Sequence, residues 1–581
     1  MPSLALITGA TGGLGKAFVA ACAARGWDLL LLGRSPERLE ALATATAREF
    51  GVQAWTYACD LTDEAARDAL WAFAVEHDLR FHLLINVAGV EFEGPFAKTT
   101  EAQLATIVRL NVEAVTAMTH GVLAHRDPWC TLRIINVSSL AAYSPMPAKA
   151  VYAASKRYIL NLSLALREEL REQDVTVTAL CSAGLPTTDF CIQAIAVQGV
   201  MGQLTTCNVG RVAARTVEQA LRGSAVYIPG FLNRLMALAA AILPGSATAA
   251  LVRRRWRAAW SEPCAPTVAR APVRLPAAPE APQNLAGKTM VVTGATDGIG
   301  AATAAALAAR GARVMGVGRS AERCAAAQAT IHAAHPNADV TFLCADLSAQ
   351  RGVRALAQEI AATMQRAGAP GLDALIHCAG AVSSWFAATE DGYERQFAVN
   401  HLAPFLLTHL LLPHLQAASG AGRVVIVGSR QHRWGQMHWQ DVMLRQRYQL
   451  LRAYAQSKLA NVLFAMEFNR RHGAVDGVRT WVADPGLVRT AIGLKETHGL
   501  ERRFWAWRSA KGRPPQEAGA HIVALAADPA VAQEAAVYWR DGAPLAPSAY
   551  AQEAEPAARL WELSARLCGL EDGVRAERQG A

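Results

Sequence analysis

TGATGGLG, at Thr8–Gly15, and TGATDGIG, at Thr293–Gly300, are two copies of one glycine-rich stretch. Each copy follows an apolar run that predicts a β-strand and opens a run that predicts a helix. Glycines at these positions permit a tight turn and let a ligand approach the backbone closely. The free N–H groups at the start of the helix can then bind a pyrophosphate, so each copy predicts a strand, a phosphate-binding turn and a helix.

A set of polar residues further along the chain is also present twice and in the same order. Gly9, Asn111, Ser139, Tyr152 and Lys156 return as Gly294, Asn400, Ser429, Tyr454 and Lys458. The offset between the copies is 285 residues at the glycines, 289 at the asparagines, 290 at the serines, and 302 at both the tyrosines and the lysines. Two copies of one fold, with a longer loop between serine and tyrosine in the second copy, explain this pattern.

Length and composition fit two globular domains. A chain of 581 residues is too long for one hydrophobic core, and its 52% hydrophobic and 18% charged residues exclude general disorder. The eleven cysteines show no metal-ligand spacing, so we expect no metal site and reduced thiols. The first residues contain no basic region that would indicate a secretory signal. We therefore expect a cytoplasmic protein.

The order of apolar runs predicts the fold class and the domain boundaries. Short β-type runs alternate with Ala- and Leu-rich helical stretches in both halves, which is typical of a doubly wound α/β fold with a parallel sheet, or Rossmann fold. The predicted units are a first domain at 1–261, a Pro- and Ala-rich linker at 262–283 and a second domain at 284–581. The expected strands are LALIT, DLLLLG, HLLINVAG, LRIINVSS and VTVTAL in the first domain, and TMVVT, RVMGVG, ALIHCAG, RVVIVGS and VRTWVAD in the second.

The net charge of +9 leaves two kinds of partner to weigh. No nucleic-acid partner is expected, because the basic residues are spread along the chain and no nucleic-acid-binding module accompanies them. Leu235–Val252 contains no charged residue and precedes a cluster of arginines. Pro244 and Gly245 interrupt this stretch, which favours two short helices that close the first domain over a membrane span. Peripheral membrane contact through 235–257 remains an open alternative.

The spacing T-G-x-x-x-G-x-G, followed by the asparagine, serine and Y-x-x-x-K positions, resembles the short-chain dehydrogenase/reductase family over nearly the whole chain outside the linker. The resemblance implies two sets of catalytic residues, which are Asn111, Ser139, Tyr152 and Lys156, and Asn400, Ser429, Tyr454 and Lys458. Residues four apart lie on one face of a helix, so the lysine ammonium can stabilise the tyrosine phenolate. This matters because an unperturbed tyrosine titrates near ~10, too high for a base at neutral pH.

The resemblance also implies which residues contact a nicotinamide cofactor. In the first half these are Thr8, Gly9, Gly13, Leu14, Gly15, Arg34, Asp60, Leu61, Asn86, Ala88, Gly89 and Thr188. In the second half they are Thr293, Gly294, Gly298, Ile299, Gly300, Arg319, Asp346, Leu347, Ala379, Gly380, Pro485, Gly486, Val488 and Thr490. Arg34 and Arg319 follow the second strands, where an arginine can pair with the 2′-phosphate of NADP. We therefore expect NADP in both halves, with NAD as the alternative.

The second half departs from the family pattern at His377 and Cys378, where the first half has Asn86 and Val87. We expect His377 and Cys378 to be satisfied interior residues and not a catalytic or metal-binding pair.

The substrate is indicated only by resemblance and by apolar residues. The second half is similar to the retinol dehydrogenase branch at Val399–Pro413, Ala453–Phe464 and Asp484–Thr490. Trp434, Met437 and Trp439, and then Phe504, Trp505 and Trp507, could form apolar walls, and the first half has an apolar lid at about 189–208. The predicted reaction is hydride transfer between NADP(H) and a hydrophobic, lipid- or retinoid-like alcohol, aldehyde or ketone.

Two other functions stay open at this point. One half could be catalytic while the other is a cofactor-binding regulator or scaffold. The protein could also be a membrane-associated lipid-binding module. The family resemblance further implies a homo-oligomer, or a pseudo-dimer of the two halves within one chain.

Overall fold

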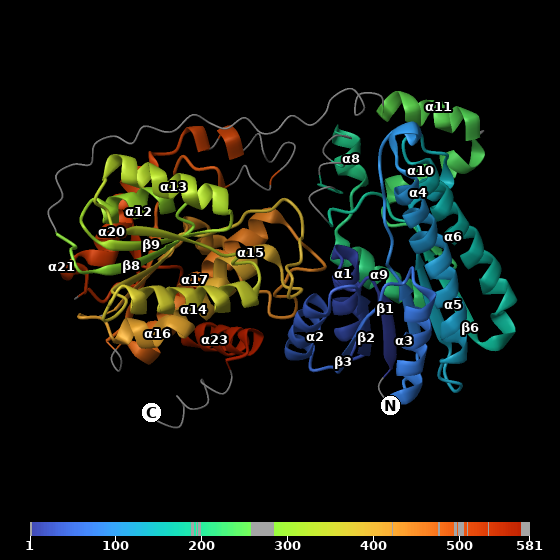
Figure 1. Cartoon of the computed structure of the whole chain (residues 1–581), viewed down its shortest axis with the longest axis horizontal. Helices are drawn as coiled ribbons and strands as arrows, with labels where there is room; N and C mark the ends of the chain where they lie inside the picture. Colours follow the sequence, from blue (N-terminus) through green and yellow to red (C-terminus); the bar gives the residue numbers. More distant parts are fainter. Residues whose placement is uncertain are drawn as a thin grey trace. The chain divides into compact units, whose positions relative to one another are not determined.

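The structure, a computed structural model, describes residues 3–187, 191–192, 195, 199–243, 245–256, 284–420, 422–473, 477–492, 497, 505–507, 509–532 and 534–570. The chain forms two compact units (Figure 1). Unit 1 contains Met1–Pro272, and unit 2 contains most of the chain from Val273 onward. The predicted linker at 262–283 lies outside the described residues.

Unit 1 is a seven-stranded parallel sheet in the order β3-β2-β1-β4-β5-β6-β7. Its strands are β1 (Leu4–Thr8), β2 (Asp28–Gly33), β3 (Ala54–Ala58), β4 (Leu83–Asn86), β5 (Leu132–Val137), β6 (Val175–Leu180) and β7 (Val226–Tyr227). Its helices are α1 (Gly13–Ala23), α2 (Pro36–Phe50), α3 (Glu64–Glu76), α4 (Glu101–Val108), η2 (Arg109–Ala114), α5 (Val115–Ala124), α6 (Ala150–Glu169), α8 (Gly199–Thr205), α9 (Val209–Leu221), α10 (Phe231–Ile242) and α11 (Gly245–Trp256), with short 3₁₀ turns η1 (Phe96–Lys98), η3 (Leu140–Tyr143) and η4 (Arg171–Gln173).

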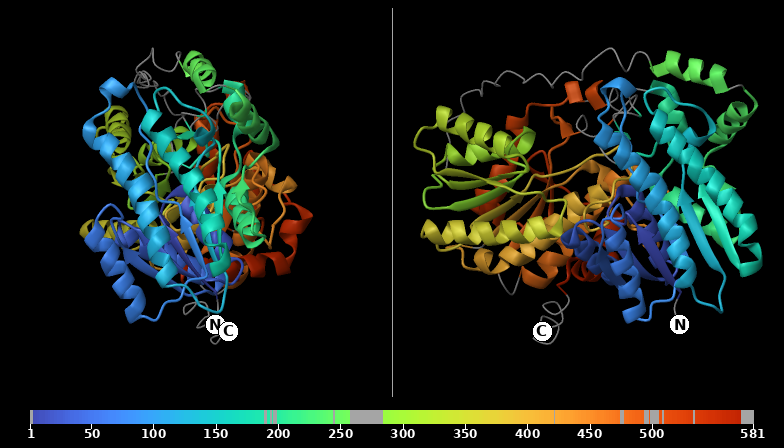
Figure 2. Two further views of the ribbon diagram at one scale, coloured as in Figure 1. Left: turned by 90° about the vertical axis from the view of Figure 1, so that its right-hand side faces the viewer. Right: turned by 45° about the vertical axis from the view of Figure 1, so that its right-hand side comes forward.

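Strand β1 shows why helices cover both faces of this sheet. Ala5 and Ile7 point into a core formed with α1, α2 and α9, whereas Leu4 and Leu6 point into a second core formed with α3 and α5. Side chains of a strand alternate between faces, so a strand that is apolar at every position needs cover on both sides. The continuous apolar runs in the sequence therefore fold into the central layer of three (Figure 2).

Unit 2 repeats this architecture with an eight-stranded sheet in the order β10-β9-β8-β11-β12-β13-β14-β15. Its strands are β8 (Thr289–Thr293), β9 (Arg313–Gly318), β10 (Val340–Cys344), β11 (Ala374–His377), β12 (Arg423–Val427), β13 (Arg479–Asp484), β14 (Tyr538–Arg540) and β15 (Ala543–Pro544). Its helices are α12 (Gly298–Ala308), α13 (Ala321–Ala334), α14 (Gln350–Arg366), α15 (Arg395–Phe397), η6 (Ala398–Leu402), α16 (Ala403–Gln416), η7 (Arg430–Trp434), α17 (Leu450–His472), α20 (Pro515–Ala527), α21 (Pro529–Ala532), α22 (Ala549–Gln552) and α23 (Ala554–Cys568).

An aromatic cluster joins three helices of unit 2. Trp561 of α23 is 1% exposed, and its ring centroid lies 5.3 Å from that of Phe405, 5.9 Å from that of Phe464 and 4.9 Å from that of His409. Edge-to-face aromatic pairs of this kind add to the apolar area that each ring buries. The C-terminal helix α23 is thereby fixed to α16 and α17.

The predicted fold class is confirmed, and so are the ten predicted strands, which form the middle of the two sheets. The sequence analysis did not name the outer strands β3, β7, β10, β14 and β15. These strands are two to five residues long, and β3 and β15 have no fully buried residue. Strand β15 also pairs antiparallel to β14, so the second sheet is mixed at its edge.

The stretch from Leu235 forms two helices, α10 and α11, as the sequence predicts. In the described part of the chain, no helix combines the length and apolar content of a membrane span.

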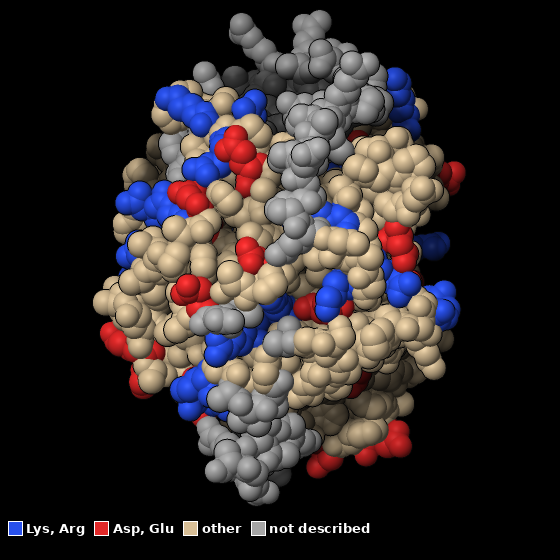
Figure 3. Space-filling model, turned by 90° about the vertical axis from the view of Figure 1, so that its left-hand side faces the viewer, with Lys and Arg blue, Asp and Glu red and all other residues tan. Residues whose placement is uncertain are grey.

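Charged side chains of both signs are interspersed on the face of the molecule in Figure 3. Several are paired in unit 2, including Lys288 with Asp373 at 2.9 Å and Arg313 with Asp339 at 2.7 Å. This face shows no continuous basic field of the kind that binds a nucleic-acid backbone.

Both sheets reverse their strand order between the first and fourth strands, β1 and β4 in unit 1 and β8 and β11 in unit 2. In open α/β sheets, ligands bind in the crevice beyond the carboxyl ends of the strands at such a reversal. The glycine-rich stretches after β1 and β8 lie at this position.

Candidate active sites

The first glycine of each turn is fixed by backbone geometry. Gly9 has φ of 62° and Gly294 has φ of 70°, a region that favours glycine. A Cβ at Gly9 would lie 2.9 Å from the Cα of Ala88, and one at Gly294 would lie 2.8 Å from the Cα of Ala379. The loop after the fourth strand therefore packs directly on the turn, and no other residue type fits there without a shift.

A threonine at the end of the first strand secures this packing in each unit. Thr8 Oγ1 accepts hydrogen bonds from the backbone N–H groups of Val87 at 3.0 Å and Ala88 at 3.1 Å. Thr293 Oγ1 accepts the equivalent bond from Ala379 at 3.2 Å. Thr8 and Thr293 thus support the turn, whereas the sequence analysis had expected them to contact the cofactor.

Unit 1 contains a cavity of about 1090 Å³ at the carboxyl ends of its strands. Arg34, Asp60 and Leu61 line it on the side of β2 and β3, and Ser139, Tyr152 and Lys156 line it on the side of β5 and α6. The predicted site residues on its wall are Gly9, Gly13, Leu14, Gly15, Arg34, Asp60, Leu61, Ala88, Gly89, Ser139, Tyr152 and Lys156. The cavity therefore joins most of the predicted cofactor residues to the predicted catalytic residues.

Asn86 lies beneath this cavity and outside its wall. Its Nδ2 donates to Thr119 Oγ1 at 3.1 Å and to Asn136 Oδ1 at 2.9 Å, so it connects β4 to β5 and α5. In unit 2 the corresponding bond is kept by a different residue, because His377 Nε2 lies 3.0 Å from Thr408 Oγ1. Burial lowers the pKa of His377 to about 3, so the ring is neutral. His377 is thus a satisfied interior residue, as the sequence predicts.

A threonine that the sequence analysis did not single out completes the glycine turn in unit 1. Thr188 lies outside the described residues. Its neighbour Thr187 packs on Gly13, where an added Cβ would be 2.8 Å from the Thr187 Cβ, as Thr490 packs on Gly298 at 3.0 Å. Thr187 thus holds in unit 1 the place that Thr490 holds in unit 2, and the loop between them and their strands differs by one residue.

The catalytic asparagines lie in π-helical turns, Asn111 in η2 and Asn400 in η6. Asn111 Oδ1 accepts from Val90 N–H at 2.9 Å, while its Nδ2 donates to Val90 O at 3.0 Å and to Ser155 Oγ at 3.2 Å. Ser155 Oγ in turn donates to Tyr152 O at 2.7 Å. The asparagine therefore fixes the loop after β4 to the helix that carries the tyrosine and the lysine.

Unit 2 contains the same network with the same partners. Asn400 accepts from Ala381 N–H at 2.7 Å and donates to Ala381 O at 3.1 Å and to Ser457 Oγ at 2.9 Å. Ser457 Oγ donates to Tyr454 O at 2.9 Å. π-Helical turns occur mostly at functional sites, and both asparagines are at most 1% exposed.

The two lysines are held in equivalent positions. Lys156 Nζ donates to Val137 O at 2.9 Å, and Lys458 Nζ donates to Val427 O at 2.8 Å. Each ammonium lies 5.7 Å from the ring centroid of its tyrosine, Tyr152 or Tyr454. Burial lowers the pKa of both lysines to about 8, so each can lose a proton near neutral pH.

The serines begin the short helices that follow the fifth strands. Ser139 Oγ accepts from Ala141 N–H at 3.1 Å, and Ser429 Oγ accepts from Gln431 N–H at 3.2 Å. Burial raises the pKa of Tyr152 above its usual value, and Ser139 partly offsets this through a hydrogen bond. Tyr152 is therefore a neutral phenol in the free protein, ready to donate its proton.

In unit 2, Tyr454 packs in an apolar cluster with Val382, Leu450, Ile492 and Trp505. Trp505 was among the aromatic residues expected at the substrate side, and Phe504 lies outside the described residues. The expected wall from the longer loop is not seen around Tyr454. Trp434 is 67% exposed, and Trp439 packs against the Arg559 guanidinium at 4.4 Å.

Comparison with known proteins decides the family. A family model described as short chain dehydrogenase matches residues 3–194 and again residues 288–500. The chain belongs to the short chain dehydrogenase family. The two matches contain the two glycine turns and both asparagine, serine, tyrosine and lysine sets.

Relatives of this dehydrogenase include enzymes of lipophilic alcohols. Dehydrogenase/reductase SDR family member 13 of Homo sapiens is 39% identical over 306 residues, which is 51% of this chain and 76% of that protein. Retinol dehydrogenase 13 of Homo sapiens is 37% identical over 50% of this chain and 86% of its own length, and polyprenol dehydrogenase of Mus musculus is 38% identical over 49% and 85%. A solved short-chain dehydrogenase from Sphingobium yanoikuyae in complex with NADPH is 30% identical, with a TM-score of 0.37, over 42% of this chain and 93% of that chain. This protein is thus an NAD(P)-dependent oxidoreductase that acts on alcohols, related to retinol and polyprenol dehydrogenases.

The cavity of this short-chain dehydrogenase also contains a charged group that the sequence analysis missed. Glu91 and Lys149 both line the cavity and form an ion pair, and Glu93 lies 3.2 Å from the same ammonium. Glu91 comes two residues after Gly89, and Lys149 comes three residues before Tyr152. That proximity to two motifs was the available signal, but it does not show that the two side chains meet.

Helices α10 and α11 close the cavity on its substrate side. Met236, Ala240 and Leu243 line the cavity from α10 and its end, and Thr248 and Val252 line it from α11. The predicted closing role of this stretch is thus seen in the lining of the cavity.

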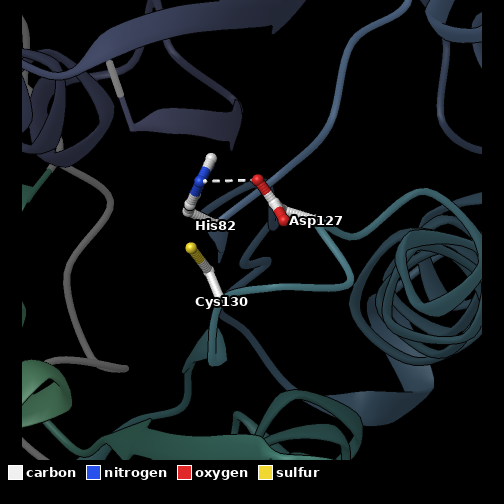
Figure 4. Close-up of side chains that lie close together, drawn as sticks. All are labelled: His82, Asp127 and Cys130. Carbon is white, nitrogen blue, oxygen red and sulfur yellow. Dashed lines mark ion pairs between the residues drawn. The ribbon is translucent and has the colours of Figure 1, made fainter. Parts of the chain in front are cut away.

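A second cluster of titratable side chains in unit 1 lies away from this site (Figure 4). The ligand atoms of His82, Asp127 and Cys130 lie within 4.8 Å of one another, a grouping that the sequence spacing did not reveal. His82 Nδ1 accepts from Leu4 N–H at 3.1 Å, and its Nε2 lies 3.3 Å from Asp127. In unit 2, Asp373 accepts the equivalent bond from Thr289 N–H at 2.8 Å. His82 therefore connects the beginnings of two strands, at the opposite end of the sheet from the cavity.

The lysine pKa values lead to a pH prediction for this dehydrogenase. kcat/KM for carbonyl reduction is expected to fall as the pH rises through about 8, because above that pH Lys156 and Lys458 lose the proton that replenishes the tyrosine. The measurement is a pH profile of kcat/KM, which reports groups of the free enzyme.

Arginine at the two lysine positions provides the control. A guanidinium stays protonated to above ~12, so the residual activity of the Lys156→Arg, Lys458→Arg enzyme should show no inflection near pH 8. An unsubstituted enzyme with a flat profile through pH 8 would contradict the assignment.

Proposed function

We propose that this chain is an NADP(H)-dependent oxidoreductase with two catalytic sites, which transfers hydride between the nicotinamide and a hydrophobic alcohol, aldehyde or ketone. The observation that carries this proposal is the repetition of one buried hydrogen-bond network around Asn111 and Asn400. Neither copy has lost the asparagine, serine, tyrosine or lysine. A half that served only as a scaffold would be under no such constraint.

The residues of each site have complementary roles in carbonyl reduction. A bound nicotinamide would supply the hydride. Serine, Ser139 or Ser429, holds the substrate oxygen by a hydrogen bond, and tyrosine, Tyr152 or Tyr454, donates a proton to that oxygen. Lysine stabilises the phenolate that remains, and the asparagine keeps the loop and the helix in register.

The predicted cofactor residues fit a dinucleotide. Asp60 Oδ1 accepts from Thr62 N–H at 3.0 Å and from Thr62 Oγ1 at 2.8 Å, and these bonds lower the pKa of Asp60, with a smaller contribution from Arg34. The carboxylate is therefore ionised and fixed at the end of the cavity where an adenosine would bind. Arg34 and Arg319 support NADP over NAD, since a guanidinium can pair with a 2′-phosphate.

The hydrophobic substrate is supported by the walls of the two sites. Helix α10 covers the unit 1 cavity with Met236, Ala240 and Leu243, and Tyr454 in unit 2 is surrounded by aliphatic and aromatic side chains. Relatives include retinol and polyprenol dehydrogenases, whose substrates are named as lipophilic alcohols.

Substitution of each tyrosine tests whether both halves turn over. Tyr152→Phe and Tyr454→Phe should each lower the reduction of a different subset of lipophilic aldehydes and ketones by about 100- to 10,000-fold. NADPH should still bind at two sites per chain, because phenylalanine keeps the shape of the site. The measurements are NADPH consumption with each single variant and the double variant, and NADPH titration.

One outcome would identify unit 1 as a scaffold or sensor. In that case Tyr152→Phe changes nothing, and Tyr454→Phe abolishes all turnover.

A second substitution tests the cofactor. Arg34→Asp with Arg319→Asp should raise the KM for NADPH by about 10- to 100-fold, because the charge-assisted pair with the 2′-phosphate is replaced by repulsion. The KM for NADH should change much less. Equal loss with both cofactors would show that these arginines do not contact the 2′-phosphate.

We further propose that unit 1 binds the surface of an anionic membrane through α10. Phe231, Leu235 and Leu238 lie on one face of this helix and are 82%, 52% and 59% exposed. Arg253–Arg255 and Arg257 follow closely in the sequence and complement anionic headgroups. The opposite face of α10 lines the cavity, so a lipophilic substrate could enter directly from the membrane.

Vesicle flotation tests this surface. Substitution of Phe231, Leu235 and Leu238 by serine should reduce binding to phosphatidylserine-containing vesicles by more than about tenfold, since each apolar side chain contributes roughly 1.5–3 kcal/mol when buried. Trp129→Ser is the matched control, because Trp129 is 92% exposed and precedes β5, away from α10. Equal flotation of the triple-serine variant and the unsubstituted chain would contradict the proposal.

A further inference from the structure

The cavity of unit 1 has one charged pair on its substrate side. Glu91 and Lys149 line it together with Ser139 and Tyr152. Their side chains are 27% and 10% exposed, so they are largely shielded from solvent. An ion pair in such a position is costly to bury and affects whatever binds beside it.

The pair belongs to a group with a net negative charge. Lys149 contacts both Glu91 and Glu93, which gives one ammonium and two carboxylates. Burial lowers the pKa of Lys149, but the two glutamates more than offset this and raise it, so the ammonium stays charged. Glu91 also raises the pKa of Tyr152, which places its carboxylate within electrostatic reach of the proton donor.

The backbone holds Glu91 and Lys149 in fixed positions. Glu91 follows Val90, whose N–H and C=O are both bound by Asn111. Lys149 begins the helix that carries Tyr152, and the residue before it, Ala148, has φ of 68°. Gly94 N–H donates to the Ala148 carbonyl at 3.0 Å and keeps this strained turn against the Glu91 loop.

Unit 2 has no equivalent charge at the two corresponding positions. At the offset of 291 residues that relates Gly89 to Gly380, Glu91 corresponds to Val382. At the offset of 302 residues that relates the tyrosines, Lys149 corresponds to Leu451. Val382 is 1% exposed and packs with Tyr454 and Leu450.

We propose that Glu91, held by Lys149, forms a substrate subsite in unit 1 that selects carbonyl compounds with a hydroxyl group next to the carbonyl, whereas Val382 gives unit 2 a preference for purely apolar carbonyl compounds. This inference rests on the proposed catalytic function of unit 1. A carboxylate only accepts hydrogen bonds, so it binds a substrate hydroxyl and rejects a hydrogen in its place. Its charge also repels a substrate carboxylate. The two halves would therefore reduce different members of one substrate series.

The test uses three probes with one ten-carbon chain, which are decan-2-one, 1-hydroxydecan-2-one and 2-oxodecanoate. The Tyr454→Phe chain reports unit 1 alone, with NADPH consumption as the readout. It should prefer the hydroxyketone to the ketone by at least about tenfold in kcat/KM, as for a hydrogen bond to a charged group. Glu91→Val, which installs the residue of unit 2, should remove this preference.

Glu93→Gln is the matched control, since Glu93 contacts the same lysine but is not among the residues that line the cavity. It should keep the hydroxyketone preference. An unchanged preference in Glu91→Val, or the same loss in Glu93→Gln, would overturn the proposal. If Glu91→Val no longer binds NADPH, Glu91→Gln keeps the size of the side chain and should raise kcat/KM for 2-oxodecanoate; no rise would overturn the proposal.

The same experiment separates this inference from the proposed function. A Tyr454→Phe chain that binds NADPH but reduces none of the probes or other carbonyl compounds would contradict catalysis by unit 1. Turnover without discrimination between the ketone and the hydroxyketone contradicts only the role of Glu91.

Discussion

The geometry of each active site depends on one buried side-chain amide. Asn111 binds both backbone groups of Val90 and also Ser155, and so joins the loop after β4 to helix α6. The loop carries the residues that pack on the glycine turn, and the helix carries the tyrosine and the lysine. A buried amide that lost one of these partners would leave polar groups unsatisfied, at a cost of about 1–3 kcal/mol for each group. The π-helical turn around Asn111 is the local distortion that lets one side chain reach both elements.

The two halves of the chain have kept this frame and changed what surrounds it. Asn86 and His377 differ in chemistry, yet each reaches the threonine at the equivalent position, Thr119 or Thr408. The pair that connects the bases of the strands has also changed, from an aspartate in unit 2 to a histidine in unit 1. Such replacements preserve a hydrogen bond while they exchange its donor or acceptor. The substrate side has no partner to preserve, and there a charged pair in unit 1 stands where unit 2 has aliphatic residues.

The sequence predicted what local pattern determines. The central strands are apolar at every position, and the catalytic tyrosine and lysine are four residues apart on one helix, so both could be recognised without a structure. The outer strands escaped prediction because they are short and half exposed. Thr187 was missed because a loop one residue shorter moves the contact away from the aligned threonine. Glu91 and Lys149 are 58 residues apart, and only the packing of the loop on the helix shows that they meet.

Unit 2 has an acid limit that follows from its buried imidazoles. Burial lowers the pKa of His377 and His401 to about 3 and that of His409 to about 4, and the last of these packs against Trp561 in the aromatic cluster. In the unfolded chain the same rings take up a proton near pH ~6.5, so stability is fully present above that pH and is lost as the pH falls toward 4. An acidic compartment would therefore loosen the second sheet through the residues that fill its core, well before it protonates the carboxylates that are paired on its surface.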